Sequence, residues 1–241
     1  GQLWGTPVFN WDSLKEQEYH WWLARIHFNL RMFDQVRIDH FRGLEAFWSV
    51  AAGEETAIHG EWVAAQGYQM LEILRKQLGN FPLIAEDLGT ITPEVQELRD
   101  HFNMPGMKVL QFGFTTDETN EHLPHNFNVN SVVYTGTHDN DTAWGWLHHA
   151  AADKEKKLAL KYLKNFQWQP VWGLIEMAWA SVSCKAVTPL QDLLELGAEA
   201  RMNIPGVAEG NWGWRFRWDQ IRGKHRRFLM EITEKYNRLD R

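Results

Sequence analysis

Short apolar strand patterns that end in an acidic residue constrain this chain more than any other feature of its sequence. Three of them lead to Asp39, Glu86 and Asp139. Each passes from β-branched or apolar residues into a carboxylate and then into turn residues, as a strand does when it enters a loop. Helical patterns separate the strands, and this alternation favours parallel βαβ units. The predicted fold class is therefore α/β, with the strands in a barrel or a doubly wound sheet.

The spacing of apolar residues and the positions of Pro and Gly predict the other elements. The expected helices cover residues 11–33, 61–78 (closed by Gly79 and Asn80), 92–104, 141–149, 153–165 and 170–181, and further strands are expected at residues 107–112 and 184–188. A closed eight-stranded barrel needs three strands more than the five that the sequence indicates. Because no internal repeat, low-complexity tract or long linker is evident, one domain over residues 1–241 is expected.

The composition supports a soluble globular protein with a substantial core. Hydrophobic residues make up 44% of the 241 residues, and 25 basic against 31 acidic residues give a formal charge of -6. This balance argues against a nucleic-acid surface over the whole chain. A local basic run is interpreted as a solvated helix face; it consists of Arg215, Arg217, Arg222, Lys224, His225, Arg226 and Arg227.

The single cysteine points to a reducing compartment, and the hydropathy of the sequence indicates no membrane span. Cys184 is the only cysteine, so no intrachain disulfide can form and a cysteine-based zinc site is not supported. No apolar run approaches the ~20 residues that span a bilayer. We therefore expect a cytoplasmic protein without a membrane partner. The pairs His148/His149 and His122/His125 lack a metal-ligand pattern, and no metal site is predicted.

The acids that follow the first two strands suit the cleavage of a glycosidic bond. A retaining glycosidase needs a carboxylate nucleophile and a protonated carboxylic acid, roughly 5–5.5 Å apart. Adjacent parallel strands would bring Asp39 and Glu86 to the same edge of a sheet. Because Arg37 lies two residues before Asp39, strand periodicity points both side chains to one face. That cation would keep Asp39 ionised, whereas Glu86 needs a raised pKa to act as the acid.

Asp139 and two histidines complete the set of candidate residues. Asp139 would stabilise the partly cationic sugar, with His138 and His40 as partners for its hydroxyl groups. The fourteen tryptophans are unusual in number. Indole faces stack on sugar rings, but tryptophan is also ordinary core material, so most of them are expected to pack internally.

Several segments resemble a known family. They match signature stretches of the 4-α-glucanotransferases, the amylomaltase or disproportionating enzymes of glycoside hydrolase family 77. The matching stretches cover residues 1–5, 36–43, 85–89, 105–112, 134–142, 189–192, 200–206 and 209–212.

The resemblance implies roles for individual residues. It makes Asp39 the nucleophile, Glu86 the general acid/base and Asp139 the transition-state stabiliser. It also implies that four residues line the donor sugar sites, namely Trp4, Arg37, His40 and His138. The implied substrates are α-1,4-glucans such as maltooligosaccharides and fragments of starch or glycogen, and the chemistry needs no metal or organic cofactor. Thr6 departs from the Asn expected in the family, which weakens the inference for sugar contacts beside Trp4.

The resemblance also implies a partial fold. Family members are about twice as long as this chain, which matches their C-terminal half. The expected architecture is the C-terminal portion of a (β/α)8 TIM barrel that lacks the first three strands, with completion by an N-terminal half. Two alternatives stay open: a hydrolase of the α-amylase kind with the same three acids, and an inactive glucan-binding fragment.

Overall fold

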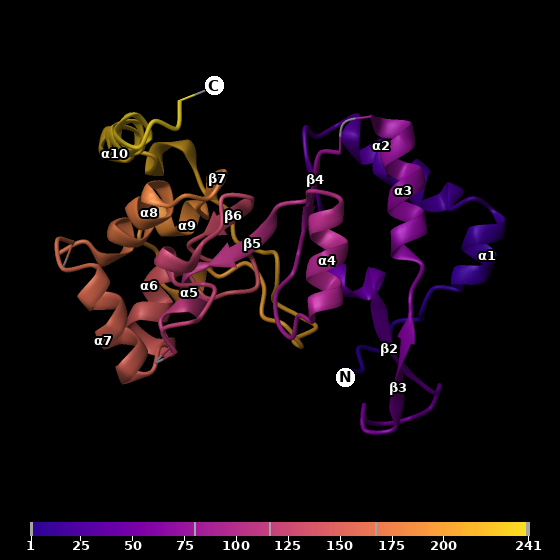
Figure 1. Cartoon of the computed structure of the whole chain (residues 1–241). Helices are drawn as coiled ribbons and strands as arrows, with labels where there is room; N and C mark the ends of the chain where they lie inside the picture. Colours follow the sequence, from indigo (N-terminus) through magenta and orange to yellow (C-terminus); the bar gives the residue numbers. More distant parts are fainter. Residues whose placement is uncertain (1, 80, 116, 167, 240–241) are drawn as a thin grey trace. The chain divides into compact units, whose positions relative to one another are not determined.

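The computed structural model describes residues 2–79, 81–115, 117–166 and 168–239. Within it the chain forms two compact units, unit 1 (Gly1–Met107) and unit 2 (Lys108–Arg241), and each is described by itself. Both units mix helices with short strands (Figure 1), so the predicted α/β class is confirmed. The expected family match at Gly1 and the helix closure at Asn80 lie outside the described residues.

Unit 1 is built on a parallel pair of strands. Its elements are α1 (Trp11–Glu16), α2 (His20–Leu30), β1 (Val36–Ile38), η1 (Phe41–Leu44), β2 (Ala46–Val50), β3 (Gly60–Ala64), α3 (Gly67–Leu78), β4 (Leu83–Ala85) and α4 (Pro93–His101). Strand β1 pairs with β4 in parallel, with Arg37 opposite Ile84. The two strands that precede Asp39 and Glu86 are therefore neighbours, as the sequence pattern predicted.

The helix expected over residues 11–33 is two helices. Glu18 and Tyr19 have left-handed backbone angles, with φ of 50° and 55°, and these angles interrupt the helix. Tyr19 is almost fully buried, and its hydroxyl donates a hydrogen bond to Gln66 Oε1 at 2.9 Å. Left-handed backbone is costly for residues other than glycine. The burial of Tyr19 and its hydrogen bond to Gln66 offset that cost, and they decide the local structure against the helical spacing.

A β-hairpin occupies the region where the predicted helix over residues 61–78 was expected to begin. Strands β2 and β3 pair antiparallel, with Trp48 opposite Trp62, and α3 begins only at Gly67. The prediction was wrong for residues 61–66. Both faces of β3 are partly exposed, so its sequence lacks the alternation that marks a strand with one buried face. Pairing with β2 decides its structure.

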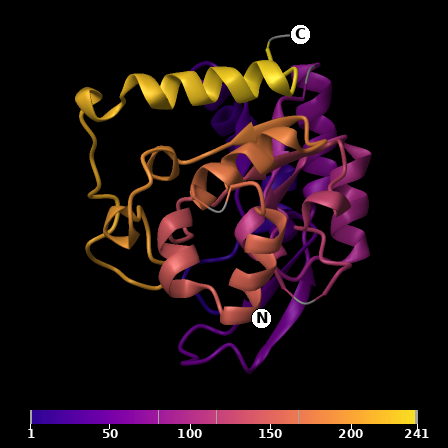
Figure 2. The same ribbon diagram turned by 90° about the vertical axis from the view of Figure 1, so that its left-hand side faces the viewer.

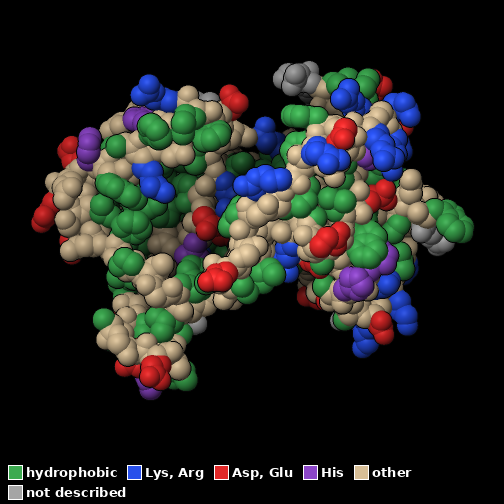
Figure 3. Space-filling model, turned by 180° about the vertical axis from the view of Figure 1, so that it is seen from behind, with side chains coloured by type: hydrophobic (Ala, Val, Ile, Leu, Met, Phe, Trp, Pro, Cys, Tyr) green, Lys and Arg blue, Asp and Glu red, His purple; other side chains and the backbone are tan. Residues whose placement is uncertain are grey.

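The core of unit 1 lies between the parallel strands and the helices. Met70, Leu71 and Leu74 of α3 are fully buried there with Leu83 of β4. Large hydrophobic side chains also remain on the surface, and they gather visibly on one side of this unit (Figure 3). Those on and just after α2 are Trp21, Phe28, Met32 and Phe33.

Unit 2 contains a three-stranded sheet in the order β5-β6-β7. Strand β5 (Gly106–Val109) begins at the unit boundary, and β6 pairs with β7 in parallel. The other elements are α5 (Leu110–Gly113), η2 (Pro124–Asn126), β6 (Ser131–Tyr134), α6 (Ala143–Gly145), the π-helix η3 (Trp146–Ala150), α7 (Asp153–Tyr162), α8 (Pro170–Ala180), β7 (Lys185–Val187), α9 (Leu190–Leu193), η4 (Ala198–Ala200), η5 (Trp218–Gln220) and α10 (Gly223–Lys235).

The helices expected over residues 153–165 and 170–181 and the strand expected over residues 184–188 are present in unit 2, whereas two other expectations need correction. The strand expected over residues 107–112 ends at Val109, because the chain turns into α5 and Gly113 approaches the backbone of His122 closely. The basic run is a helix face only in part. Lys224 lies on α10, which packs against α8 (Figure 2), whereas Arg215 and Arg217 lie outside any helix.

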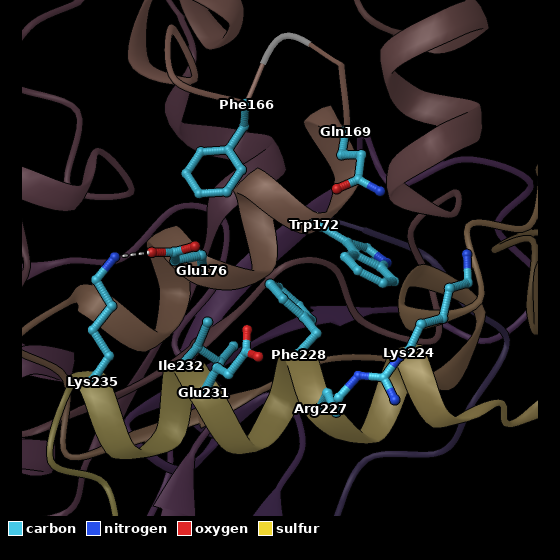
Figure 4. A pocket seen from close by; sticks show the side chains of 10 residues that line it. All are labelled: Phe166, Gln169, Trp172, Glu176, Lys224, Arg227, Phe228, Glu231, Ile232 and Lys235. Atoms are coloured by element: carbon cyan, nitrogen blue, oxygen red, sulfur yellow. Dashed lines mark hydrogen bonds and ion pairs between the residues drawn. The ribbon is translucent and has the colours of Figure 1, made fainter.

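Helices α8 and α10 enclose a pocket of about 360 Å³ (Figure 4). On its wall Trp172 stacks against Phe228 with ring centroids 4.4 Å apart, and both rings are buried. The buried carboxylate of Glu176 accepts hydrogen bonds from Lys235 Nζ and the Tyr236 hydroxyl, each at 2.7 Å. Trp172, Phe228 and Glu176 therefore already have partners within the protein.

No helix among the described residues is long and apolar enough to cross a membrane.

Candidate active site

Glu86 follows β4 and is held by the backbone of two loops. Its Oε2 accepts a hydrogen bond from the backbone N–H of His40 at 2.7 Å, and its Oε1 accepts one from the N–H of Leu88 at 3.1 Å. The backbone of Glu86 also donates to Ile38 O at 3.0 Å, which continues the pairing between the parallel strands. Strand pairing thus joins the loop after β1 to the Glu86 carboxylate.

The surroundings of Glu86 favour its protonated form. Burial raises the pKa of the Glu86 carboxyl above its ordinary value, and the negative charge of Asp39 adds to this rise. The two backbone hydrogen bonds and the positive charge of Arg37 oppose it without cancelling it. A carboxyl with a raised pKa keeps its proton to higher pH, as a general acid must.

Asp39 has a different environment. Its Oδ1 lies 2.7 Å from Arg37 Nη2 in an ion pair, and 77% of the Asp39 side chain is exposed. Arg37 is further positioned by a contact from its Nε to Met107 Sδ at 3.2 Å. The prediction that Arg37 and Asp39 share one face is confirmed. Two neighbouring carboxyl groups, one paired with a cation and one partly buried, are the arrangement that separates a nucleophile from an acid.

His40 links these residues to the N-terminal segment. Its φ of 49° is left-handed, and this angle accompanies the contact of its N–H with Glu86. The imidazole contacts the Trp4 ring edge to face, with centroids 4.8 Å apart. Burial lowers the pKa of His40; Asp39 raises it and Arg42 lowers it. Trp4 remains 59% exposed, so much of its indole is open to a ligand.

A buried ion pair supports the loop that carries Glu86. The Asp87 carboxylate, next in sequence after Glu86, lies 2.5 Å from Arg99 Nη1. It also accepts a hydrogen bond from the N–H of Met107 at 2.7 Å. A Cβ at Gly106 would lie 2.3 Å from the Asp87 carboxylate. Glycine at that position therefore lets the ion pair and the strand end fit together.

In unit 2, side chains hold Asp139. Asn203 Nδ2 donates to Asp139 Oδ1 at 2.6 Å, and His138 Nε2 lies 3.3 Å from Oδ2. Arg201 Nη2 donates to the backbone carbonyl of Asp139 at 2.6 Å. The His138 ring in turn contacts the Trp212 ring, with centroids 5.2 Å apart. Asp139 is thus oriented by a segment that lies more than sixty residues further along the chain.

A fully buried carboxylate, Asp192, supports the same loop. Its Oδ2 accepts from Thr135 Oγ1 at 2.6 Å, and its Oδ1 accepts from the N–H of Ala143 at 2.7 Å. These donors lie just after β6 and at the start of α6, on either side of Asp139 in sequence. Burial raises the pKa of Asp192 to about 6, although both hydrogen bonds lower it.

The predicted site residues therefore form two groups. Trp4, Arg37, Asp39, His40 and Glu86 are connected within unit 1, and His138 and Asp139 are connected within unit 2. Among the described residues there is no group of three or more His, Cys, Asp or Glu side chains that could hold a metal ion.

Comparison with known proteins decides the family. Glycoside hydrolase family 77, described as 4-alpha-glucanotransferase, matches residues 1–220. The chain belongs to this family. Members similar to it include the 4-alpha-glucanotransferase of Synechocystis sp., which is 51% identical over 99% of this chain and 48% of its own length. The enzyme of Thermus thermophilus is 44% identical over 99% of this chain and 49% of its own length. The chain thus spans about half the length of these family members.

A solved structure of the family gives the same result for the fold. The amylomaltase from Streptococcus agalactiae in complex with acarbose is 38% identical and superposes with a TM-score of 0.92. The match covers 98% of this chain and 48% of the amylomaltase. The family predicted from the motifs is thereby confirmed.

The residues around Asp139 are the ones that sequence reasoning assigned no role. Arg201 and Asn203 lie in the matching stretch 200–206, and Trp212 ends the stretch 209–212. Their types carried a signal, because an arginine and an asparagine near a loop carboxylate are potential donors. Their partner was not predictable, since the segment is irregular and no strand or helix periodicity fixes where it lies.

Proposed function

We propose that this chain carries the catalytic acids of a 4-α-glucanotransferase, which moves a segment of an α-1,4-glucan to another glucan or to glucose. The observation that carries the proposal is the pair of carboxyl groups after β1 and β4. Asp39 is paired with Arg37, and Glu86 is held by backbone donors in surroundings that raise its pKa. The family membership of the chain supports the same activity.

The proposed mechanism is a retaining double displacement. Asp39 attacks the anomeric carbon and forms a glycosyl-enzyme, while Glu86 gives its proton to the departing glycosidic oxygen. Glu86, now ionised, takes the proton of the incoming 4-hydroxyl group, which attacks the anomeric carbon and releases Asp39. Asp139 stabilises the positive charge that develops on the sugar, and Asn203 keeps its carboxylate oriented. Transfer rather than hydrolysis requires that water be excluded from the intermediate.

Substrate contacts are proposed for Trp4, Arg37, His40 and His138. Trp4 and His138 present partly exposed rings, which suit the apolar faces and the hydroxyl groups of glucose. The substrates would be maltooligosaccharides and fragments of starch or glycogen. The Streptococcus agalactiae relative was solved with acarbose, which supports an oligosaccharide ligand. Acid, base and nucleophile are all side chains of this sequence, so no metal or organic cofactor is needed.

The proposed architecture is a partial barrel. Parallel pairing of β1 with β4 and of β6 with β7 supports strands from a (β/α)8 barrel. Both units would belong to one catalytic domain over residues 1–241, completed by a segment equivalent to the half of the relatives that this chain does not span. A cytoplasmic location also remains part of the proposal and rests on the single cysteine.

Incubation with maltotriose and separation of the products by size tests this function. Glucose together with maltopentaose and longer glucans would establish transfer. Maltose and glucose without longer products would favour the hydrolase alternative. If the chain is inactive alone, the assay is repeated with the other half of the Synechocystis relative added. Inactivity of that mixture would leave the inactive glucan-binding fragment as the better interpretation.

A further inference from the structure

Aromatic residues occupy every second position just after the segment that orients Asp139. Trp212, Trp214, Phe216 and Trp218 alternate with Gly213, Arg215 and Arg217. We name these four aromatic residues the aromatic ribbon. It lies in unit 2, in the long connection between α9 and α10 that Figure 2 draws in gold. The backbone is left-handed at Trp212, with φ of 59°, and the 3-10 helix η5 begins at Trp218, so the period-two alternation of an extended chain applies only between these two residues.

Ring contacts join three members of the aromatic ribbon to one another and the fourth member to His138. Trp214 and Phe216 are stacked with centroids 6.1 Å apart, and Phe216 meets Trp218 edge to face at 5.2 Å. At the other end Trp212 contacts His138, the neighbour of Asp139. Six residue steps cover at most roughly 20 Å, because the chain is not extended at either end of the ribbon. The ribbon therefore continues from His138 over a length that accommodates a few sugar units.

Hydrogen bonds brace the ribbon. The N–H of Trp212 donates to Met202 O at 2.7 Å, and Arg215 Nη1 donates to the carbonyls of Trp212 and Trp214 at 2.9 and 2.7 Å. At the far end the N–H of Arg217 donates to Gln220 Oε1 at 2.6 Å. A braced segment holds its rings in place before a ligand arrives, which reduces the entropy lost on binding.

Core packing does not account for the ribbon. Trp218 is 77% exposed and Trp212 is 51% exposed. In the same unit, Trp172 shows what a packed tryptophan looks like, since it is stacked on Phe228 and 7% exposed. The pocket beside Trp172 (Figure 4) presents no such open ring. The free indole surface of unit 2 that adjoins Asp139 thus lies on the ribbon.

The charges on the ribbon favour a neutral ligand. Arg215 is used on the backbone of the ribbon, and Arg217 Nε lies 3.2 Å from Asp219 Oδ1 in an exposed ion pair. An anionic polymer such as a nucleic acid would meet the Asp219 carboxylate. A glucan has flat apolar faces that stack on indole and hydroxyl groups that bond to arginine, carboxylate and indole N–H groups.

We propose that the aromatic ribbon is a binding track for an α-1,4-glucan chain, beginning at His138 and ending at Trp218. The inference rests on the proposed function, because it takes the glucan as the substrate held beside Asp139. It implies that long glucans bind more tightly than maltotriose, which is too short to reach Trp218.

Retardation in native gels that contain amylose tests the proposal. The full chain is used with Asp39→Asn in every variant, so that turnover does not consume the polysaccharide. Trp218→Ala and Trp212→Ala are each expected to weaken amylose affinity about three- to tenfold, while Trp218→Phe retains most of it. The matched control is Trp168→Ala, which removes a 97% exposed tryptophan of the same unit outside the ribbon and should leave retardation unchanged.

Two results would refute the proposed binding track. One is that the chain with Asp39→Asn alone is not retarded by amylose, and the other is that the Trp218→Ala and Trp168→Ala variants are retarded equally. Titration with maltotriose and maltoheptaose adds an independent comparison, and an equal effect of Trp218→Ala on both sugars would also contradict the proposal. Maltotriose turnover by the chain with Asp39 intact, measured alone and with the other half of the Synechocystis relative added, reports separately on the proposed function. Retardation through the ribbon without turnover in either assay would leave glucan binding by the ribbon standing and remove the function. Turnover with unaltered retardation in Trp218→Ala would do the reverse.

Discussion

Glu86 in unit 1 and Asp139 in unit 2 both follow a short buried strand, but different kinds of donor hold them. Glu86 accepts hydrogen bonds from the backbone N–H groups of His40 and Leu88. Asp139 accepts one from the side chain of Asn203 and lies beside the His138 imidazole. Backbone donors come with the strand pairing itself, whereas side-chain donors depend on individual residues. Substitutions of the surrounding side chains should therefore disturb the position of the Glu86 carboxyl less than that of the Asp139 carboxylate.

The largest expected effect comes from removing the two proposed reacting groups of unit 1. Under the proposed mechanism, Asp39→Asn and Glu86→Gln should each lower transferase activity by about 10³-fold or more, because one variant loses the proposed nucleophile and the other the proposed proton donor. Glutamine keeps only one of the two backbone hydrogen bonds, because its amide nitrogen cannot accept from the second N–H group. The thermal unfolding of Glu86→Gln should therefore shift to a modestly lower temperature than that of the unsubstituted chain. Normal turnover of maltotriose by the Asp39→Asn variant would refute the nucleophile assignment.

Stability tests how much unit 1 depends on the buried pair behind Glu86. Arg99→Met should destabilise the chain by about 3–5 kcal/mol, because it leaves the Asp87 carboxylate buried without its cation. The control is Arg217→Met, whose ion pair with Asp219 is exposed and should be worth less than about 1 kcal/mol. Urea denaturation measures both. Similar midpoints for the two variants would show that the Asp87 pair is not needed for stability.

The side-chain donor of unit 2 provides the direct test of the comparison. Asn203→Ala should lower kcat about 10–100-fold, since Asp139 would lose its orienting hydrogen bond while unit 1 stays intact. Asn29→Ala serves as the control, because the Asn29 side chain donates an exposed hydrogen bond to the carbonyl of Arg25 within α2. A variant with unchanged kcat would mean that Asp139 needs no side-chain support.

The smallest expected effect concerns pH and Asp192. Its folded pKa of about 6 lies above its ordinary value of 3.8, so folding favours the protonated form. This contribution to stability is present below about pH 4 and is lost as the pH rises through 6. Asp192→Asn should remove a fall of roughly 1–3 kcal/mol in the free energy of unfolding over that range. If the free energy of unfolding changed equally with pH in Asp192→Asn and in the unsubstituted chain, Asp192 would not be the source of the fall.

The same difference between the units explains what could be predicted from the sequence. The strands before Asp39, Glu86 and Asp139 follow from apolar runs that end in a carboxylate. The ion pair of Arg37 with Asp39 follows from strand periodicity, and the pair is seen. These contacts are local or depend on a single parallel pairing, so a linear pattern is enough to find them.

The missed features depend on contacts that no linear pattern encodes. The hairpin of β2 and β3 was expected to be helical at Glu61, because its residues suit a helix until β2 pairs with them. The end of α1 is set by Tyr19, which reaches Gln66 on a distant segment. Asn203 finds Asp139 across sixty-four positions of mostly irregular chain. In each case tertiary structure decides between local alternatives of similar energy.

The left-handed backbone at His40 has an evolutionary consequence. The group that contacts Glu86 Oε2 is the N–H of residue 40, and every amino acid except proline carries that group. A substitution of His40 removes the imidazole but leaves this donor in place, unless the new residue is proline. Glycine would even relieve the cost of a φ of 49°. Sequence drift can therefore change the side chain at this position, a proposed sugar contact, while the Glu86 carboxyl keeps its backbone donor.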